Sequence, residues 1–172
     1  MPKIIENLRS ELIKTGKSIL IEKGYKALTM REVASISNIA LGTVYNYFSS
    51  KDEMVASIMM QDWTEVFSKQ NSYTDTGSAI EGLRIIYEDI EEFSSIYRNV
   101  WKEYGSTSGL TNSRHLLLIG QIHGYVKVIF DKFKIKDNDN VSMFISETIL
   151  ASAVREDVTF ETIEPFIKKL IN

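Results

Sequence analysis

The sequence predicts an all-α protein on three observations. Apolar residues recur close to helical spacing in nearly every long segment of the 172-residue chain. Two capping boxes, Thr29 with Glu32 and Ser50 with Glu53, indicate helix starts, because each hydroxyl can accept a hydrogen bond from an N–H of the first turn. There are only two prolines, so few segments are barred from helix formation.

The first fifty residues predict three helices. An apolar stripe over residues 5–20 indicates an amphipathic helix that stops at Gly24. A second helix begins at the Thr29 cap. Asn38 follows it, and asparagine is the non-glycine residue that best tolerates the left-handed backbone of a sharp turn. A third short helix covers about residues 41–47, which completes the outline of a helix-turn-helix.

The third helix has an unusual outer face. Helical spacing turns Val44 and Phe48 inward and leaves hydroxyl, amide and aromatic groups outside. Such groups suit a duplex, because phosphates accept from hydroxyls and base edges pair with amides. Gly42 costs this helix roughly 1 kcal/mol against alanine, which close approach to a sugar-phosphate strand would justify. The alternative is that Tyr45, Tyr47 and Phe48 are core aromatics, and for Phe48 we prefer it.

Charge divides the chain. Residues 1–51 carry eight Lys or Arg against four Glu, a net of +4, and residues 52–172 carry twelve against nineteen, a net of −7. The overall charge of −3 therefore hides a basic N-terminal segment on an acidic body. This asymmetry favours phosphate at one end of the molecule, although ordinary variation of a solvated surface produces it as well.

The N-terminal motifs resemble the DNA-binding domain of TetR-family transcriptional regulators. They are Gly24-Tyr25, Thr-Met-Arg-Glu-Val-Ala at 29–34, Gly-Thr-Val-Tyr-Asn-Tyr-Phe at 42–48 and Ser-Lys-Asp-Glu-Met at 50–54. Three positions depart from the family pattern: Ala40 replaces the usual Ser or Thr cap, Leu41 a basic or polar residue, and Asn38 a frequent glycine. Loss of the cap costs the third helix about 1 kcal/mol, and Leu41 suggests contact with a thymine methyl.

The resemblance implies a three-helix DNA-binding domain at residues 1–50 and a helical-bundle domain for ligand binding and dimerisation at residues 51–172. The partner it implies is double-stranded DNA. The residues expected to contact it are Thr29, Met30, Arg31, Leu41, Gly42, Thr43, Tyr45, Asn46, Tyr47 and Lys51.

Apolar spacing in the rest of the chain predicts six more helices, over about residues 51–71, 78–93, 95–104, 111–133, 141–154 and 159–171. Loops are predicted at residues 105–109 and 136–140. The last two helices are apolar on more than one stripe, which packing on the body alone does not explain. In TetR-like proteins these helices pair with those of a second subunit, so the resemblance implies a homodimer. The interface candidates are Phe144, Ile149, Ala153, Phe166 and Leu170.

Aromatic residues gather where the resemblance implies a ligand cavity. Buried Trp and Tyr need a polar partner, so a cluster of them suits a small-molecule effector, although each residue singly can be plain core. The pocket candidates are Trp63, Phe67, Tyr87, Tyr97, Trp101 and His123.

No catalytic or metal site is predicted. A ferritin-like iron site needs Glu-x-x-His pairs, but Asn112 and Gly120 stand three before His115 and His123. The two histidines lie about 12 Å apart along one helix, too far for one metal. We expect no cofactor and no enzyme activity. Without cysteines, an apolar run of eighteen residues or a signal-like N-terminus, we expect a cytoplasmic protein with no membrane partner.

Together these features predict a dimeric TetR-like regulator, a repressor that binds a palindromic operator and is released by a small-molecule effector. The alternative from another class is a helical ligand-binding or partner-binding protein whose N-terminal domain serves as a DNA tether or activator module.

Overall fold

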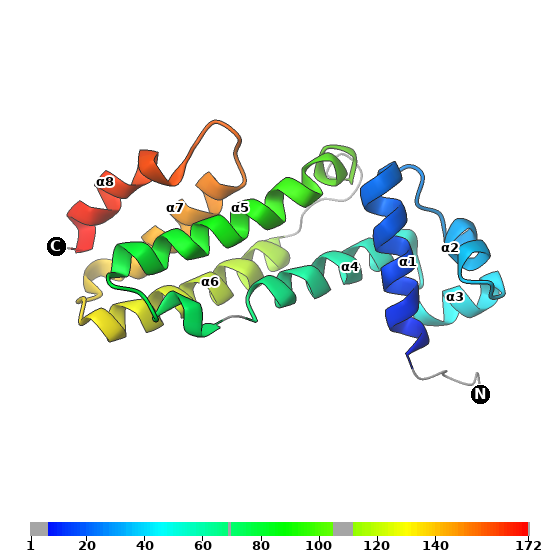
Figure 1. The fold of residues 1–172 in the computed structure, drawn as a ribbon, viewed down its shortest axis with the longest axis horizontal. Helices are drawn as coiled ribbons and strands as arrows, with labels where there is room; N and C mark the ends of the chain where they lie inside the picture. Colours follow the sequence, from blue (N-terminus) through cyan, green and yellow to red (C-terminus); the bar gives the residue numbers. More distant parts are fainter. Residues whose placement is uncertain (1–6, 69, 105–111, 172) are drawn as a thin grey trace. The chain divides into compact units, whose positions relative to one another are not determined.

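The structure is a computed structural model that describes residues 7–68, 70–104 and 112–171 (Figure 1). Within these ranges the chain is helical and contains no strand. The elements are α1 (Leu8–Lys23), α2 (Met30–Ile36), α3 (Leu41–Tyr47), α4 (Lys51–Val66), η1 (Gln70–Tyr73), α5 (Ala79–Tyr104), α6 (Asn112–Phe133), η2 (Asn138–Asn140), α7 (Val141–Ala153) and α8 (Phe160–Ile171). The all-α prediction is therefore confirmed.

The chain forms two compact units that differ from the boundary expected at residue 50. Of the described residues, one unit contains 7–64 with 96–104, and the other contains 65–68 and 70–95 with 112–171. The first unit thus contains most of α4 and the end of α5 in addition to the helix-turn-helix. Sequence patterns do not show this grouping, because it depends on contacts between segments far apart in the chain.

The first unit is built on a close crossing of α1 and α4. Gly16 is buried in α1, and a Cβ placed on it would lie 3.0 Å from the Met54 sulfur and 3.1 Å from a methyl carbon of Ile58. Both of these α4 side chains are fully buried. Gly16 therefore allows α1 and α4 to cross closely.

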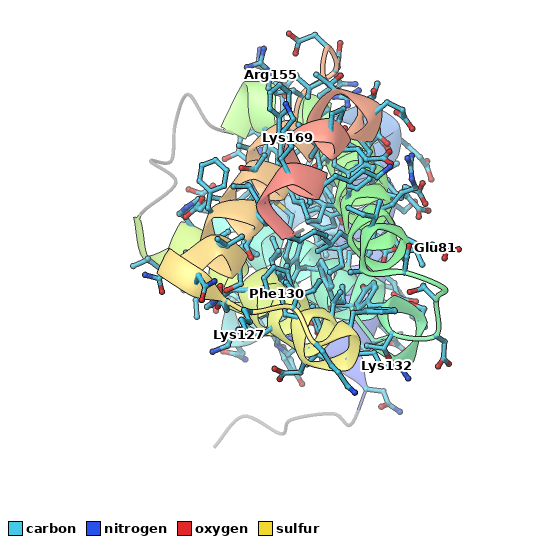
Figure 2. The ribbon with its side chains drawn as sticks, turned by 90° about the vertical axis from the view of Figure 1, so that its left-hand side faces the viewer. Glu81, Lys127, Phe130, Lys132, Arg155 and Lys169 are labelled. Carbon is cyan, nitrogen blue, oxygen red and sulfur yellow. The ribbon has the colours of Figure 1, made fainter. Side chains whose placement is uncertain are left out.

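The second unit contains the remaining helices. Within it α6 packs on α7, and α7 packs on α8. α5 joins α8 through an edge-on contact between the Tyr87 and Phe160 rings, whose centroids lie 5.6 Å apart. In the end-on view of Figure 2 the charged residues Glu81, Lys127, Lys132, Arg155 and Lys169 lie on the outside, and Phe130 is buried.

Two predicted helix boundaries in the body were wrong. Residues 79–104 form one continuous helix, α5, where two were expected. The Ser95 hydroxyl donates to the Glu92 carbonyl at 2.7 Å, so this serine hydrogen-bonds back onto its own helix and does not interrupt it. α4 ends at Val66 instead of 71. Just beyond this end, the Ser68 hydroxyl donates to the Glu65 carbonyl at 2.7 Å. The loop expected at 105–109 lies outside the described residues.

Candidate nucleic-acid interface

The helix-turn-helix forms as its capping residues predict. The Thr29 hydroxyl accepts from the Glu32 N–H at 3.1 Å and starts α2. Asn38 has a φ of 53°, the left-handed conformation expected for the turn. The next residue, Ile39, donates its N–H to the Ala34 carbonyl at 3.0 Å, which closes the turn before α3 begins. Ala40 at the N-cap provides no side-chain hydrogen bond, in agreement with the expected loss of the cap.

The faces of α3 divide as predicted. Val44 and Phe48 are fully buried, so these two anchor the helix to the unit. The outer face includes Tyr45, which is 50% exposed, together with the exposed Asn46. The other three expected residues, Leu41, Thr43 and Tyr47, are half-buried. A row of hydroxyl and amide groups therefore faces away from the core on a helix held by apolar contacts.

Gly42 lies on this outer face with open space around it. It is exposed, and a Cβ placed on it meets no atom within 4 Å. Packing inside the protein therefore does not require a glycine at this position.

The expected contact residues of α2 need one correction. Thr29 and Arg31 are exposed, but Met30 is only 6% exposed and points into the core. The first residue of a short amphipathic helix can face either way, and the apolar side chain is here buried with its neighbours. Met30 thus supports α2 and presents no side chain to a duplex.

Two cations near α3 are held by aromatic rings. The Lys51 ammonium lies 3.7 Å from the centre of the Tyr25 ring, and the Tyr25 hydroxyl donates to Asp52 at 2.6 Å. Partial burial lowers the pKa of Lys51, against the opposing effect of Asp52 and Glu103. The Arg9 guanidinium lies 5.0 Å from the centre of the Phe48 ring. These contacts place positive charge beside α3 in a defined geometry.

The six pocket candidates are divided between the two compact units. Trp63, Tyr97 and Trp101 belong to the first unit, whereas Phe67, Tyr87 and His123 belong to the second. The Tyr87 hydroxyl donates to the Val158 carbonyl at 2.6 Å, and His123 pairs with the Ser142 hydroxyl at 2.8 Å. The polar groups of Tyr87 and His123 thus have hydrogen-bond partners within the protein.

A buried polar cluster was not predicted from the sequence. Asp62 of α4 accepts from the Tyr97 hydroxyl of α5 at 2.5 Å and forms an ion pair with Lys17 of α1 at 2.7 Å. Tyr97 is fully buried, and burial followed by the hydrogen bond to Asp62 raises the pKa of its hydroxyl. The cluster joins three helices of the first unit. Its members stand 45 and 35 positions apart, so no local pattern could reveal them.

The dimer candidates also need a correction. Phe144, Phe166 and Leu170 are 60%, 65% and 42% exposed, as an interface requires. Ile149 and Ala153 are fully buried inside the protomer, so they belong to its core. Both lie on the face of α7 that packs against its neighbours, and the apolar periodicity of α7 does not separate its two sides.

The histidines have ordinary partners. His115 is exposed and lies 3.2 Å from a Glu147 carboxylate oxygen. Among the described residues no group of three or more His, Cys, Asp or Glu is placed to hold a metal ion. Within the part of the chain that the structure covers, no helix is both long and apolar enough to cross a membrane.

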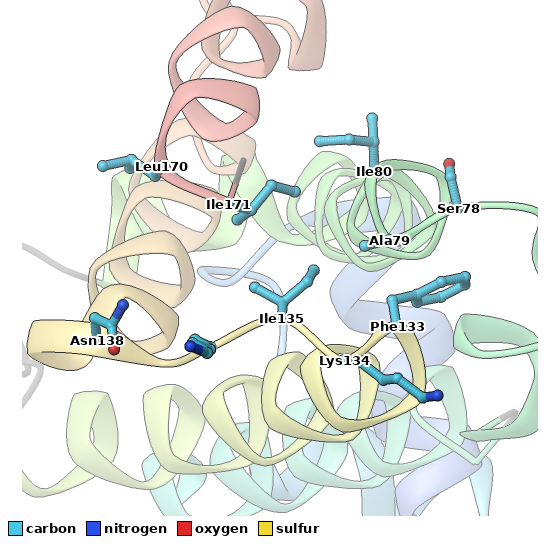
Figure 3. Close-up of a pocket in the computed structure, with 10 residues that line it drawn as sticks. Ser78, Ala79, Ile80, Phe133, Lys134, Ile135, Asn138, Leu170 and Ile171 are labelled. Carbon is cyan, nitrogen blue, oxygen red and sulfur yellow. The ribbon is translucent and has the colours of Figure 1, made fainter.

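One cavity, of about 580 Å³, lies in the second unit, at a place that the sequence did not suggest (Figure 3). It is lined by Ser78, Ala79, Ile80, Phe133, Lys134, Ile135, Lys136, Asn138, Leu170 and Ile171. These residues come from three segments, the start of α5, the end of α6 with the following loop, and the end of α8. Nothing in any one segment marks it as a cavity wall.

Comparison with known proteins agrees with the helix-turn-helix at the start of the chain. Residues 12–58 match the family model described as bacterial regulatory proteins, tetR family. The HTH-type transcriptional repressor KstR2 of Mycobacterium tuberculosis (strain ATCC 25618 / H37Rv) is 29% identical over 86 residues, which cover 48% of this chain and 42% of that protein. The match thus spans less than half the length of this relative.

Solved structures share the fold over nearly the whole chain. The multidrug binding protein EbrR, complexed with imidazole, superposes with a TM-score of 0.67 at 11% identity and covers 98% of this chain and 97% of that one. FadR from Bacillus subtilis, in complex with stearoyl-CoA, gives 0.61 at 14% identity and covers 95% and 97%. Residues 12–58 thus resemble the N-terminal domain of the tetR family of bacterial regulatory proteins, and the chain shares the fold of these solved structures.

Proposed function

We propose that this protein is a transcriptional repressor that binds a palindromic operator as a homodimer and is released by a small-molecule effector. The observation that carries the proposal is α3, whose hydroxyl and amide groups face outward while Val44 and Phe48 anchor it. The matching relative KstR2 is named a transcriptional repressor, which supports repression over activation.

The residues of α3 and the first residue of α4 have different roles in recognition. Tyr45 of α3 and Lys51 of α4 donate to phosphates, which positions α3 on the duplex without selecting a sequence. Asn46 and Thr43 reach base edges, where an amide can pair with adenine and a hydroxyl with several bases. Gly42 lets a sugar-phosphate strand approach the backbone of the helix.

The homodimer rests on the exposed apolar residues of α7 and α8. Phe144 and Phe166 are each at least 60% exposed, a large apolar area for a monomer to leave in water. A second copy would cover these side chains. A two-fold dimer also supplies two α3 helices, which a palindromic site with half-sites about 34–36 Å apart requires.

Effector release requires coupling between the two units. α5 contributes residues 79–95 to the second unit and residues 96–104 to the first, where Tyr97 holds Asp62 of α4 and, through it, Lys17 of α1. A ligand that shifts α5 would therefore act on the DNA-binding helices as well. Ligand and DNA would weaken each other by the same factor, commonly a coupling of about 1–3 kcal/mol.

A gel-shift titration tests DNA binding directly. The protein should bind a fragment of its own promoter region, and the logarithm of its affinity should fall linearly with the logarithm of salt concentration. Lys51→Met keeps the apolar stem over Tyr25 and should lower that slope by about 1. Lys132→Met, on α6, is the matched control and should leave the slope unchanged. Absence of any salt-sensitive binding would refute the assignment.

Base reading is tested with a library of operator variants. Tyr45→Phe should weaken binding equally for all sequences, whereas Asn46→Ala should relax the preference at one position of each half-site, by about 1–3 kcal/mol. A protein that binds but does not repress a reporter behind its promoter would favour the alternative, a DNA tether or activator module.

A further inference from the structure

We propose that the cavity between α5, α6 and α8 is a binding site for an amphipathic carboxylate, a molecule with an aliphatic or aromatic body and one negative charge. The inference goes beyond the proposed function, because binding at this site does not require the ligand to be the effector.

The size and walls of the cavity suit the body of such a molecule. Its volume of about 580 Å³ falls within the range typical of small-molecule sites, about 300–1,000 Å³. Six of its ten described lining residues are apolar: Ala79, Ile80, Phe133, Ile135, Leu170 and Ile171. In Figure 3 Ile135 and Ile171 face each other beside the start of α5, and Ala79 lies on the α5 side of the same opening.

The polar part of the lining has one sign of charge. Its two charged lining residues are the exposed Lys134 and Lys136, and Ser78 and Asn138 are the other polar residues. None of the described lining residues is acidic. The neighbouring Asp137 accepts from the Ser142 N–H at 2.8 Å and from the Ser142 hydroxyl, which hold the pKa of its carboxyl below the usual range. The Asp137 carboxylate is thus hydrogen-bonded to Ser142 at the start of α7.

The end of α6 forms part of the cavity wall. Lys134 follows α6 with a φ of 57°, the left-handed conformation that helix ends usually assign to glycine or asparagine. Ile135 then donates its N–H to the Phe130 carbonyl at 2.9 Å. This bond ends α6 at the cavity and brings Lys134 and Ile135 into its lining.

These observations specify the ligand class. The apolar walls take a hydrocarbon or aromatic body, and the two lysines attract a carboxylate, whereas a cation of the same shape would meet repulsion without a compensating acid. The ion pairs of the ligand carboxylate with Lys134 and Lys136 would be partly exposed. They would therefore contribute mainly to selectivity for negative charge and only a little to affinity.

The test is calorimetric titration of the DNA-free, full-length protein with decanoate at low salt. Decyltrimethylammonium, of similar chain length and opposite charge, is titrated in parallel. We expect decanoate to bind and the cation to bind at least tenfold more weakly. Absence of decanoate binding, or equal binding of the two probes, would overturn the proposal.

Location is tested with two double variants that remove the same charge. Lys134→Asn with Lys136→Gln keeps a residue that tolerates left-handed backbone, and it should weaken decanoate binding by roughly threefold to tenfold. Lys127→Gln with Lys132→Gln removes two exposed lysines of α6 outside the cavity and should leave the affinity unchanged. Equal losses in both would place binding elsewhere. Because the titrations contain no DNA, failure here leaves the repressor proposal to the gel-shift test.

Discussion

Replacing Gly42 by alanine separates the stability of the protein from its affinity for DNA. Since a Cβ at this exposed position of α3 meets no atom within 4 Å, alanine fits there without a steric clash. Alanine favours helix over glycine by up to about 1 kcal/mol. The variant should therefore unfold at slightly higher urea concentration, with an unfolding equilibrium constant up to about fivefold smaller.

DNA affinity should change in the opposite direction. If a sugar-phosphate strand lies against the backbone of α3, the added methyl group overlaps it, and such overpacking costs about 1–3 kcal/mol. This corresponds to a loss of affinity of roughly fivefold to more than a hundredfold. Fluorescence anisotropy with a labelled operator at fixed salt measures this loss, and urea unfolding of the same preparation measures the gain.

Gly120→Ala provides the matched control. Gly120 is also exposed within a helix, α6, and a Cβ there also meets no atom within 4 Å. The Gly120→Ala variant should increase the stability of the protein by a similar amount and leave operator affinity unchanged. Wild-type operator affinity in Gly42→Ala would refute the close approach of a DNA strand to this helix, and equal losses in both variants would point to a general effect on folding.

Four further variants test the dimer, a buried hydrogen bond and an exposed ion pair. Phe166→Glu should give a folded monomer in ultracentrifugation, because an unpaired charge would enter the interface, whereas Ala153→Glu should unfold the protomer, because Ala153 is fully buried. Tyr97→Phe should lower the free energy of unfolding by about 1.5–3 kcal/mol, since a hydrogen bond to a charged partner is lost. Arg84→Met should lower the melting temperature at neutral pH but not near pH 2. Its hydrogen bond lowers the pKa of Glu161 from 4.5 to about 2, so this stabilisation is present above pH 4.5 and is lost as the pH falls through about 2.

Controls make these three tests decisive. Met60→Glu, on an exposed apolar residue of α4, should leave the dimer intact, and a monomeric wild type would contradict the interface. Tyr45→Phe removes an exposed hydroxyl and should leave unfolding unchanged, in contrast to Tyr97→Phe. An Arg84→Met difference that persists unchanged at pH 2 would show that packing of Arg84 over the Phe160 ring, 4.5 Å away, dominates over charge.

The sequence alone was sufficient where the determinants are local. The Thr29 hydroxyl, the left-handed Asn38 and the apolar pair Val44 and Phe48 act within a few residues of one another, so the position of the turn and the orientation of α3 followed from the order of residues. The start of α4 at the Ser50 cap followed in the same way, with the Glu53 N–H donating to the Ser50 hydroxyl at 3.1 Å.

Tertiary structure decided what depends on distant segments. Met30, Ile149 and Ala153 have suitable chemistry for an interface, and only packing shows that they are buried. The contact of Asp62 with Tyr97, and the cavity beside Lys134, bring together segments separated by tens of residues. Helical periodicity shows that a helix has an apolar face, but what covers that face depends on how the chain folds back on itself.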